Sequence, residues 1–180
     1  MSRRTPIDRA REQFEPGEGR EQAIVAYFKE RVYATFTGLA IVLVVSADDH
    51  PEADHAFFAL VLGVIGITAA GFVSDVVSHL AVHRRFPNGP EFGMELRIAG
   101  GALGTLVTPG IMLLLAWLDV LDLDTALTVC TIVYIVTLAV IGWAAVRRAD
   151  LNWGQKLVAL GILLALGLLV IGLQTLAHSI

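Results

Sequence analysis

The sequence predicts an all-α fold, a polytopic transmembrane bundle of five helices with a short amphipathic amino-terminal helix. Three observations predict it. The composition is 56% hydrophobic and only 17% charged, which is too apolar for a soluble domain whose surface must meet water. Apolar stretches recur along the chain at about the 20 residues that a bilayer span requires. The segments between these stretches alternate between basic and acidic.

The amino-terminal segment, residues 1–31, is expected to be a cytoplasmic polar arm with an interfacial amphipathic helix. Thr5 as a cap and Pro6 at the first helical position start a short surface helix. Residues 22–31 place apolar side chains at helical spacing beside charged ones. That pattern fits either a helix lying at the lipid headgroups or a cytoplasmic extension of the first span. The arm has no apolar signal-peptide core, so the first span is expected to act as its own insertion signal.

The transmembrane domain is expected over residues 32–180, and its spans follow from apolar length and from the turn residues between them. The first span is short, so the residues before it are expected to extend it. Pro87 to Pro90 form a turn cluster in the connection 84–95, and Asp122 or Asp124 would cap the fourth span. The expected spans cover about residues 32–46, 56–83, 96–118, 125–146 and 155–178.

The basic residues predict the orientation of the chain. All thirteen Lys and Arg residues lie in the amino-terminal segment, between residues 84 and 97, or between residues 147 and 156. The other two connections, around residues 48–54 and 119–124, are acidic and contain none. Because connections rich in Lys and Arg stay inside, we expect a multi-pass protein of the cytoplasmic (inner or plasma) membrane, with its amino terminus inside and its carboxyl terminus outside.

Asp75, His79 and His83 are the candidate functional residues of the second span. They lie four residues apart, and steps of four drift by only about 40° around a helix, so the three side chains share one face. His83 is expected at the cytoplasmic surface and Asp75 near the middle of the bilayer. Ionisable groups are costly in lipid unless they face a bundle interior or water, so this row predicts a path for protons or small cations.

Three threonines are expected at the depth of Asp75, namely Thr37, Thr105 and Thr137 on the other spans. Pro109 lacks the amide hydrogen that would bond the carbonyl of Thr105, which adds a polar group at that level. A purely structural interpretation stays open: a threonine hydroxyl holds Asp75 in its protonated form, and the row only orders the bundle.

The remaining motifs point away from catalysis. Only two of the three residues Asp75, His79 and His83 fall within reach of a single ion, so no metal site or other cofactor is expected. Cys130 is the single cysteine and is interpreted as a small packing residue. The sequence shows no pairing of a nucleophile with a general base, so we do not expect an enzyme. It also lacks a surface rich in basic and aromatic residues, so we do not expect nucleic-acid binding. Gly100 and Gly104 predict close helix packing, within the bundle or with a second copy.

Short motifs at the ends of the spans carry a resemblance. They are Ser78-His79-Leu80-Ala81, the run from Gly142-Trp143 to Arg147-Arg148, and Leu176-Ala177-His178. The pattern resembles small uncharacterised five-span integral membrane proteins of actinobacteria over residues 30–178. This resemblance implies the topology and assigns no task. In its five spans the chain is also similar to the vacuolar iron transporter class. However, residues 84–96 lack the acidic metal-binding stretch that such a match implies.

The sequence therefore leads to two hypotheses. In the first, the protein passes or senses protons or small cations through a polar intramembrane layer around Asp75. In the second, it is a non-catalytic structural or assembly subunit of a membrane complex. The expected partners are the lipid bilayer and either further copies of the chain or a membrane-complex partner.

Overall fold

The computed structural model describes residues 18–148, 154–155, 157–158 and 161, and the regular structure of this part is helical throughout. This confirms the predicted all-α fold class. The labelled helices are α2 (Glu18–Ser46), α3 (Ala53–His83), α4 (Gly89–Leu103), η1 (Gly104–Leu106), α5 (Val107–Trp117) and α6 (Leu123–Arg148).

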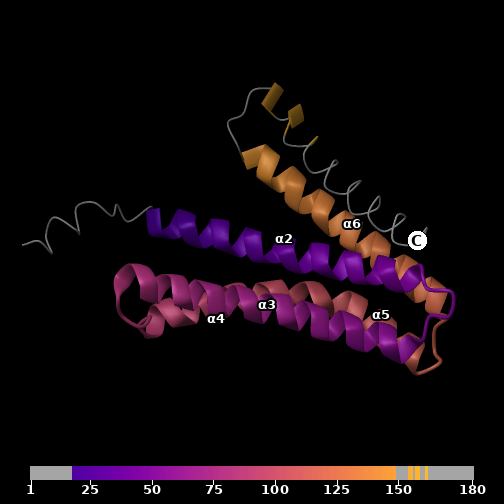
Figure 1. The fold of residues 1–180 in the computed structure, drawn as a ribbon. Helices are drawn as coiled ribbons and strands as arrows, with labels where there is room; N and C mark the ends of the chain where they lie inside the picture. Colours follow the sequence, from indigo (N-terminus) through magenta and orange to yellow (C-terminus); the bar gives the residue numbers. More distant parts are fainter. Residues whose placement is uncertain (1–17, 149–153, 156, 159–160, 162–180) are drawn as a thin grey trace, which may run out of the picture.

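Helix α2 lies at the centre of the arrangement and packs against α3, α4 and α6 (Figure 1). Helices α3 and α5 pack against each other, and α5 also packs against α6. The connections after α2 and after α5 lie at one end of the molecule, and the connection between α3 and α4 lies at the other (Figure 1). Helix α6 lies against the carboxyl-terminal half of α2 and then diverges from it.

Among the described residues, three helical segments are long and apolar enough to cross a membrane: Ala53–His83, Gly89–Trp117 and Leu123–Ala145. They correspond to the predicted second, third and fourth spans. The predicted first span, residues 32–46, lies within α2, which is not among the three. The predicted surface helix near Thr5 and nearly all of the span 155–178 lie outside the described residues. The count of five spans therefore stays a prediction.

The predicted third span begins earlier than expected, because α4 starts at Gly89 rather than at residue 96. The side chain of Asn88 accepts a hydrogen bond from the Glu91 amide (3.1 Å), and the Glu91 carboxylate accepts one from the Asn88 amide (2.8 Å). This capping box and the proline in the first turn start the helix inside the turn cluster. The predicted connection 84–95 is consequently only five residues long, from Arg84 to Asn88.

The predicted cap of the fourth span is present, because the Thr125 amide donates to Asp122 Oδ2 (3.1 Å) and Asp122 thus caps α6. The helix from Gly89 to Trp117 tightens to a 3₁₀ turn at Gly104–Leu106, three to five residues before Pro109, which has no amide hydrogen to donate. Pro109 itself is buried, and its carbonyl accepts a hydrogen bond from the Cys130 thiol (3.5 Å).

The apolar core lies in the half of the bundle nearest the connections after α2 and α5. Its largest members include Val42, Leu60, Val64, Leu113 and Tyr134. By contrast, large apolar side chains are exposed along the helices, among them Leu62, Val73 and Val140. Apolar exposure on this scale is typical of a surface that meets lipid.

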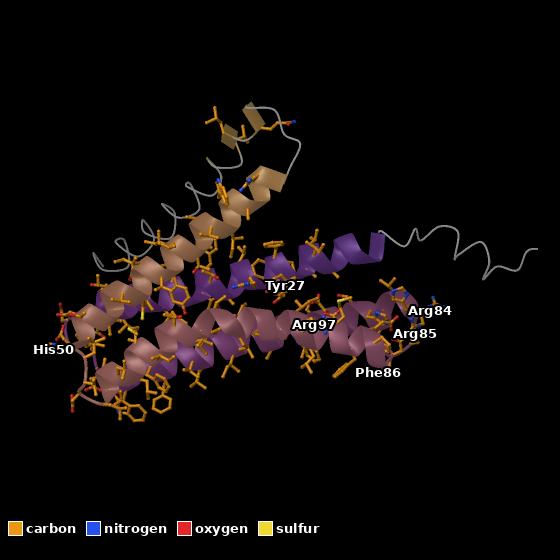
Figure 2. The ribbon with its side chains drawn as sticks, turned by 180° about the vertical axis from the view of Figure 1, so that it is seen from behind. Tyr27, His50, Arg84, Arg85, Phe86 and Arg97 are labelled. Atoms are coloured by element: carbon orange, nitrogen blue, oxygen red, sulfur yellow. The ribbon has the colours of Figure 1, made fainter. Side chains whose placement is uncertain are left out.

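The charged connections lie at opposite ends of the molecule. Figure 2 shows His50, which belongs to the acidic connection after α2, at one end. Arg84 and Arg85 lie at the other end, and Tyr27 and Arg97 lie in the same half as these arginines (Figure 2). The basic and acidic connections that alternate along the sequence thus lie at opposite ends of the bundle axis.

Gly38 provides a test of the packing of α2 on α6. A Cβ atom at this position would overlap the ring of Tyr134, whereas a Cβ at Gly66 would meet no atom within 4 Å. We expect Gly38→Leu to lower the free energy of unfolding by about 1–3 kcal/mol, because the core has no room for the added side chain. Unfolding in mixed micelles measures it, with Gly66→Leu as the matched control. Equal stability of the two variants would contradict this packing.

Candidate functional site

Asp75 contacts charged side chains from two neighbouring helices. Lys29 Nζ of α2 lies 3.6 Å from Asp75 Oδ1 and 3.5 Å from Glu30 Oε1. From α4, the Glu95 carboxyl group is in hydrogen-bonding and electrostatic contact with Asp75. Lys29, Glu30, Asp75 and Glu95 are called the charged cluster below. It joins α2, α3 and α4.

Gly71 makes room for the most buried member of the charged cluster. It lies one turn before Asp75 on α3, and a Cβ atom there would overlap the Glu30 carboxylate. The Glu30 side chain therefore packs directly against the backbone of α3 and is only 5% exposed. A residue with any side chain at position 71 would displace this carboxylate.

The charged cluster is partly withdrawn from water. The Asp75 side chain is 22% exposed and that of Lys29 is 41% exposed. Burial alone would lower the pKa of Lys29, but the carboxylates of Asp75 and Glu30 outweigh it and raise the pKa, so the ammonium stays charged. One ammonium thus faces three carboxyl groups, so the cluster contains more acidic than basic side chains.

His79 and His83 form a second polar group nearer the connection between α3 and α4. Their ring centroids lie 4.4 Å apart with the ring planes tilted by 42°, and His79 Nε2 lies 3.5 Å from Glu91 Oε2 without forming a hydrogen bond. Glu91 is held on its other side by a two-pronged contact with Arg85, at 2.7 and 2.9 Å. The side chains from Arg85 to His79 therefore link the end of the bundle to the turn of α3 that follows Asp75.

The structure brings the predicted site residues together only in part. Asp75, His79 and His83 share one face of α3, and the contacts recorded for Asp75 go to Lys29 and Glu95. The hydroxyl of Thr105 donates to the Ala102 carbonyl, and that of Thr137 to the Val133 carbonyl, each at 2.7 Å within its own chain segment.

Thr37 lies about two turns along α2 from Lys29 and Glu30. No contact between Asp75 and any of the three threonines is recorded in the described part of the chain, and the threonine layer stays a prediction.

Sequence reasoning missed Lys29, Glu30 and Glu95 as partners of Asp75. Sequence analysis left open whether residues 22–31 lie at the headgroups or extend the first span, and α2, which is continuous from Glu18 to Ser46, shows that they extend the helix. Glu95 was expected in the connection before the third span, whereas α4 already begins at Gly89 and carries it. The capping box at Asn88 was the readable signal for α4.

Gly100 and Gly104, which were predicted to pack closely, have more open surroundings than Gly101. A Cβ at Gly101 would overlap the ring of Tyr27, whereas at Gly100 or Gly104 it would meet no described atom within 4 Å. Close packing at these two glycines therefore stays a prediction. Within the described residues, no group of three or more His, Cys, Asp or Glu side chains is arranged to hold a metal ion.

Comparison with known proteins does not assign the chain to a family. No protein-family model matches it, and no curated protein or solved structure matches it either. The charged cluster is consequently the feature from which a function has to be inferred.

A double-mutant cycle tests the contact between Glu30 and Gly71. We expect Gly71→Ala to be less stable than Gly66→Ala by about 1 kcal/mol, because the added methyl group makes the Glu30 carboxylate move from its position against α3. In a Glu30→Ala background the same change should cost little, which gives a coupling energy of about 1 kcal/mol or more. Gly66→Ala, at an open position on the same helix, is the control. A Gly71→Ala penalty that persists without Glu30 would rule out this contact as its cause.

Proposed function

We propose that the chain is a five-span protein of the cytoplasmic membrane that passes or senses protons or small cations through the charged cluster. The observation that supports this proposal is the meeting of three carboxyl groups and one ammonium between α2, α3 and α4. Ionisable groups at such a position are costly unless they are paired, and they commonly mark an ion or proton pathway in membrane proteins.

The charge balance of the cluster supports exchange of protons. Lys29 neutralises one carboxylate, which leaves two carboxyl groups without a counter-charge among the four members. Carboxylates that share a site disfavour each other's charged form, and Asp75 and Glu95 lie close enough to interact. The cluster is therefore suited to bind and release a proton.

The histidines supply a connection between the cluster and the basic end of the molecule. His79 follows Asp75 by one turn of α3, and His83 follows His79 by one more. Imidazole groups change charge near neutral pH, so they are suited to relay protons between the connection at residues 84–88 and Asp75.

Asp75→Asn tests the proposed pathway. In proteoliposomes with a pH gradient, we expect this variant to reduce protein-dependent proton movement by about tenfold or more, because the amide cannot exchange a proton at that position. Asp119→Asn is the matched control. Asp119 is exposed and has a positive φ of 57°, a conformation that asparagine also adopts.

Unchanged proton movement in Asp75→Asn would favour the alternative, a structural or assembly subunit. The contacts of Lys29 with Asp75 and of Arg85 with Glu91 support that alternative, since the first ties α2 to α3 and the second links the start of α4 to the connection before it. In that case the variant should lose thermal stability or recovery of a larger complex while proton movement stays the same.

The proposed orientation places the basic end of the bundle in the cytoplasm, in accordance with the excess of Lys and Arg there. In a Cys130→Ala background, we expect Arg85→Cys to react with a membrane-impermeant thiol reagent only in inverted vesicles. Asp49→Cys, at the opposite end, should react only in intact cells. Reaction of both cysteines from the same side would contradict the orientation.

A further inference from the structure

We infer that Lys29 is a tethered counter-ion, which occupies the cation position of the charged cluster and thereby makes it a proton site from which metal cations are excluded. This inference rests on the proposed function, because it names the class of ion that the same site handles. It assigns to Lys29 the role of a selectivity-determining residue.

The position of the ammonium group is the first support. Lys29 Nζ lies 3.5 and 3.6 Å from carboxylate oxygens on two different helices. The charges that act on Glu95 are those of Asp75, Lys29 and Glu30, so the four groups are mutual neighbours. A compact, singly charged ammonium is thus located where a bound monovalent cation would be attracted most strongly.

The attachment of Lys29 to the backbone is the second support. Lys29 is adjacent to Glu30 on α2, so its ammonium group cannot diffuse away from the carboxylates that it neutralises. A cation from solution would have to displace a charge that is held at high effective concentration. A proton binds directly to a carboxyl oxygen and needs no separate space, and the carboxyl groups that Lys29 leaves without a counter-charge remain open to it.

Two other cations in this half of the molecule, Arg31 and Arg85, have partners of their own. The Arg31 guanidinium lies 5.6 Å above the Tyr27 ring, and its Nη1 donates to the Tyr27 hydroxyl at 3.0 Å. Arg85 is paired with Glu91, which is also the carboxylate nearest His79. Arg97 is exposed on α4. Within the described residues, the ion pairs recorded for Glu30 and Asp75 are therefore with Lys29.

Removal of the ammonium should expose the cluster to cations from solution. The test measures thermal unfolding of the detergent-solubilised full chain at pH 8, in choline chloride and in sodium, potassium or calcium chloride at equal ionic strength. Lys29→Met should gain a melting temperature that rises by about 2 °C or more with one of these cations, because binding to the folded state stabilises it. The wild type and Lys29→Arg should show no difference from choline.

Arg97→Met is the control for the loss of one positive charge at an exposed position. Absence of a cation effect in Lys29→Met, an equal effect in Arg97→Met, or a saturable effect in the wild type would each overturn the inference. Should Lys29→Met not be recovered in folded form, Lys29→Gln replaces it. If neither variant folds in any of the salts, an external cation does not substitute for the ammonium, and the inference is likewise overturned.

This outcome is separable from that of the transport assay. A wild type stabilised by sodium or calcium would overturn the role of Lys29 and still leave a cation pathway through the cluster. Unchanged proton movement in Asp75→Asn would remove the pathway, whereas the cation response of Lys29→Met does not depend on transport.

Discussion

The contact between the Lys29 ammonium and the Asp75 carboxylate is the interaction on which the rest of this half of the molecule depends. Asp75 lies on an otherwise apolar helix, and a carboxylate withdrawn from water is stable only when a partner of opposite charge is near. In the structure this partner comes from another helix, because the ion pair recorded for Asp75 is with Lys29 of α2. This requirement brings α2 and α3 together at the level of Asp75.

The other members of the cluster depend on where the helices begin. Lys29 and Glu30 reach α3 because α2 is helical from Glu18 and continues without interruption to Ser46. Glu95 reaches Asp75 because the capping box at Asn88 starts α4 early. Gly71 then allows the Glu30 carboxylate to lie against the backbone of α3. The helix starts thus bring Glu30 and Glu95 into a cluster whose recorded cation, within the described residues, is Lys29.

The sequence predicted the parts of this arrangement that depend on a single segment. Apolar length located the three helices that can cross a membrane, and a spacing of four residues placed Asp75, His79 and His83 on one face. The partners of Asp75 were not predictable in the same way, because pairing across helices depends on helix starts and on small residues. Sequence analysis assigned no partner to Glu30 or Glu95, whereas the helices that carry them direct both side chains toward the cluster.

The two halves of the bundle differ in a way that bears on access to the cluster. The half nearest the acidic connections contains the apolar core, including Leu60, Val64 and Leu113, whereas the charged cluster and the histidines lie toward the basic end. A proton moves readily between titratable groups and does not cross close-packed aliphatic side chains without water. Through the described residues, the polar route therefore leads from the cluster to the connection at residues 84–88. Under the proposed function, protons would therefore reach the cluster from that end of the molecule.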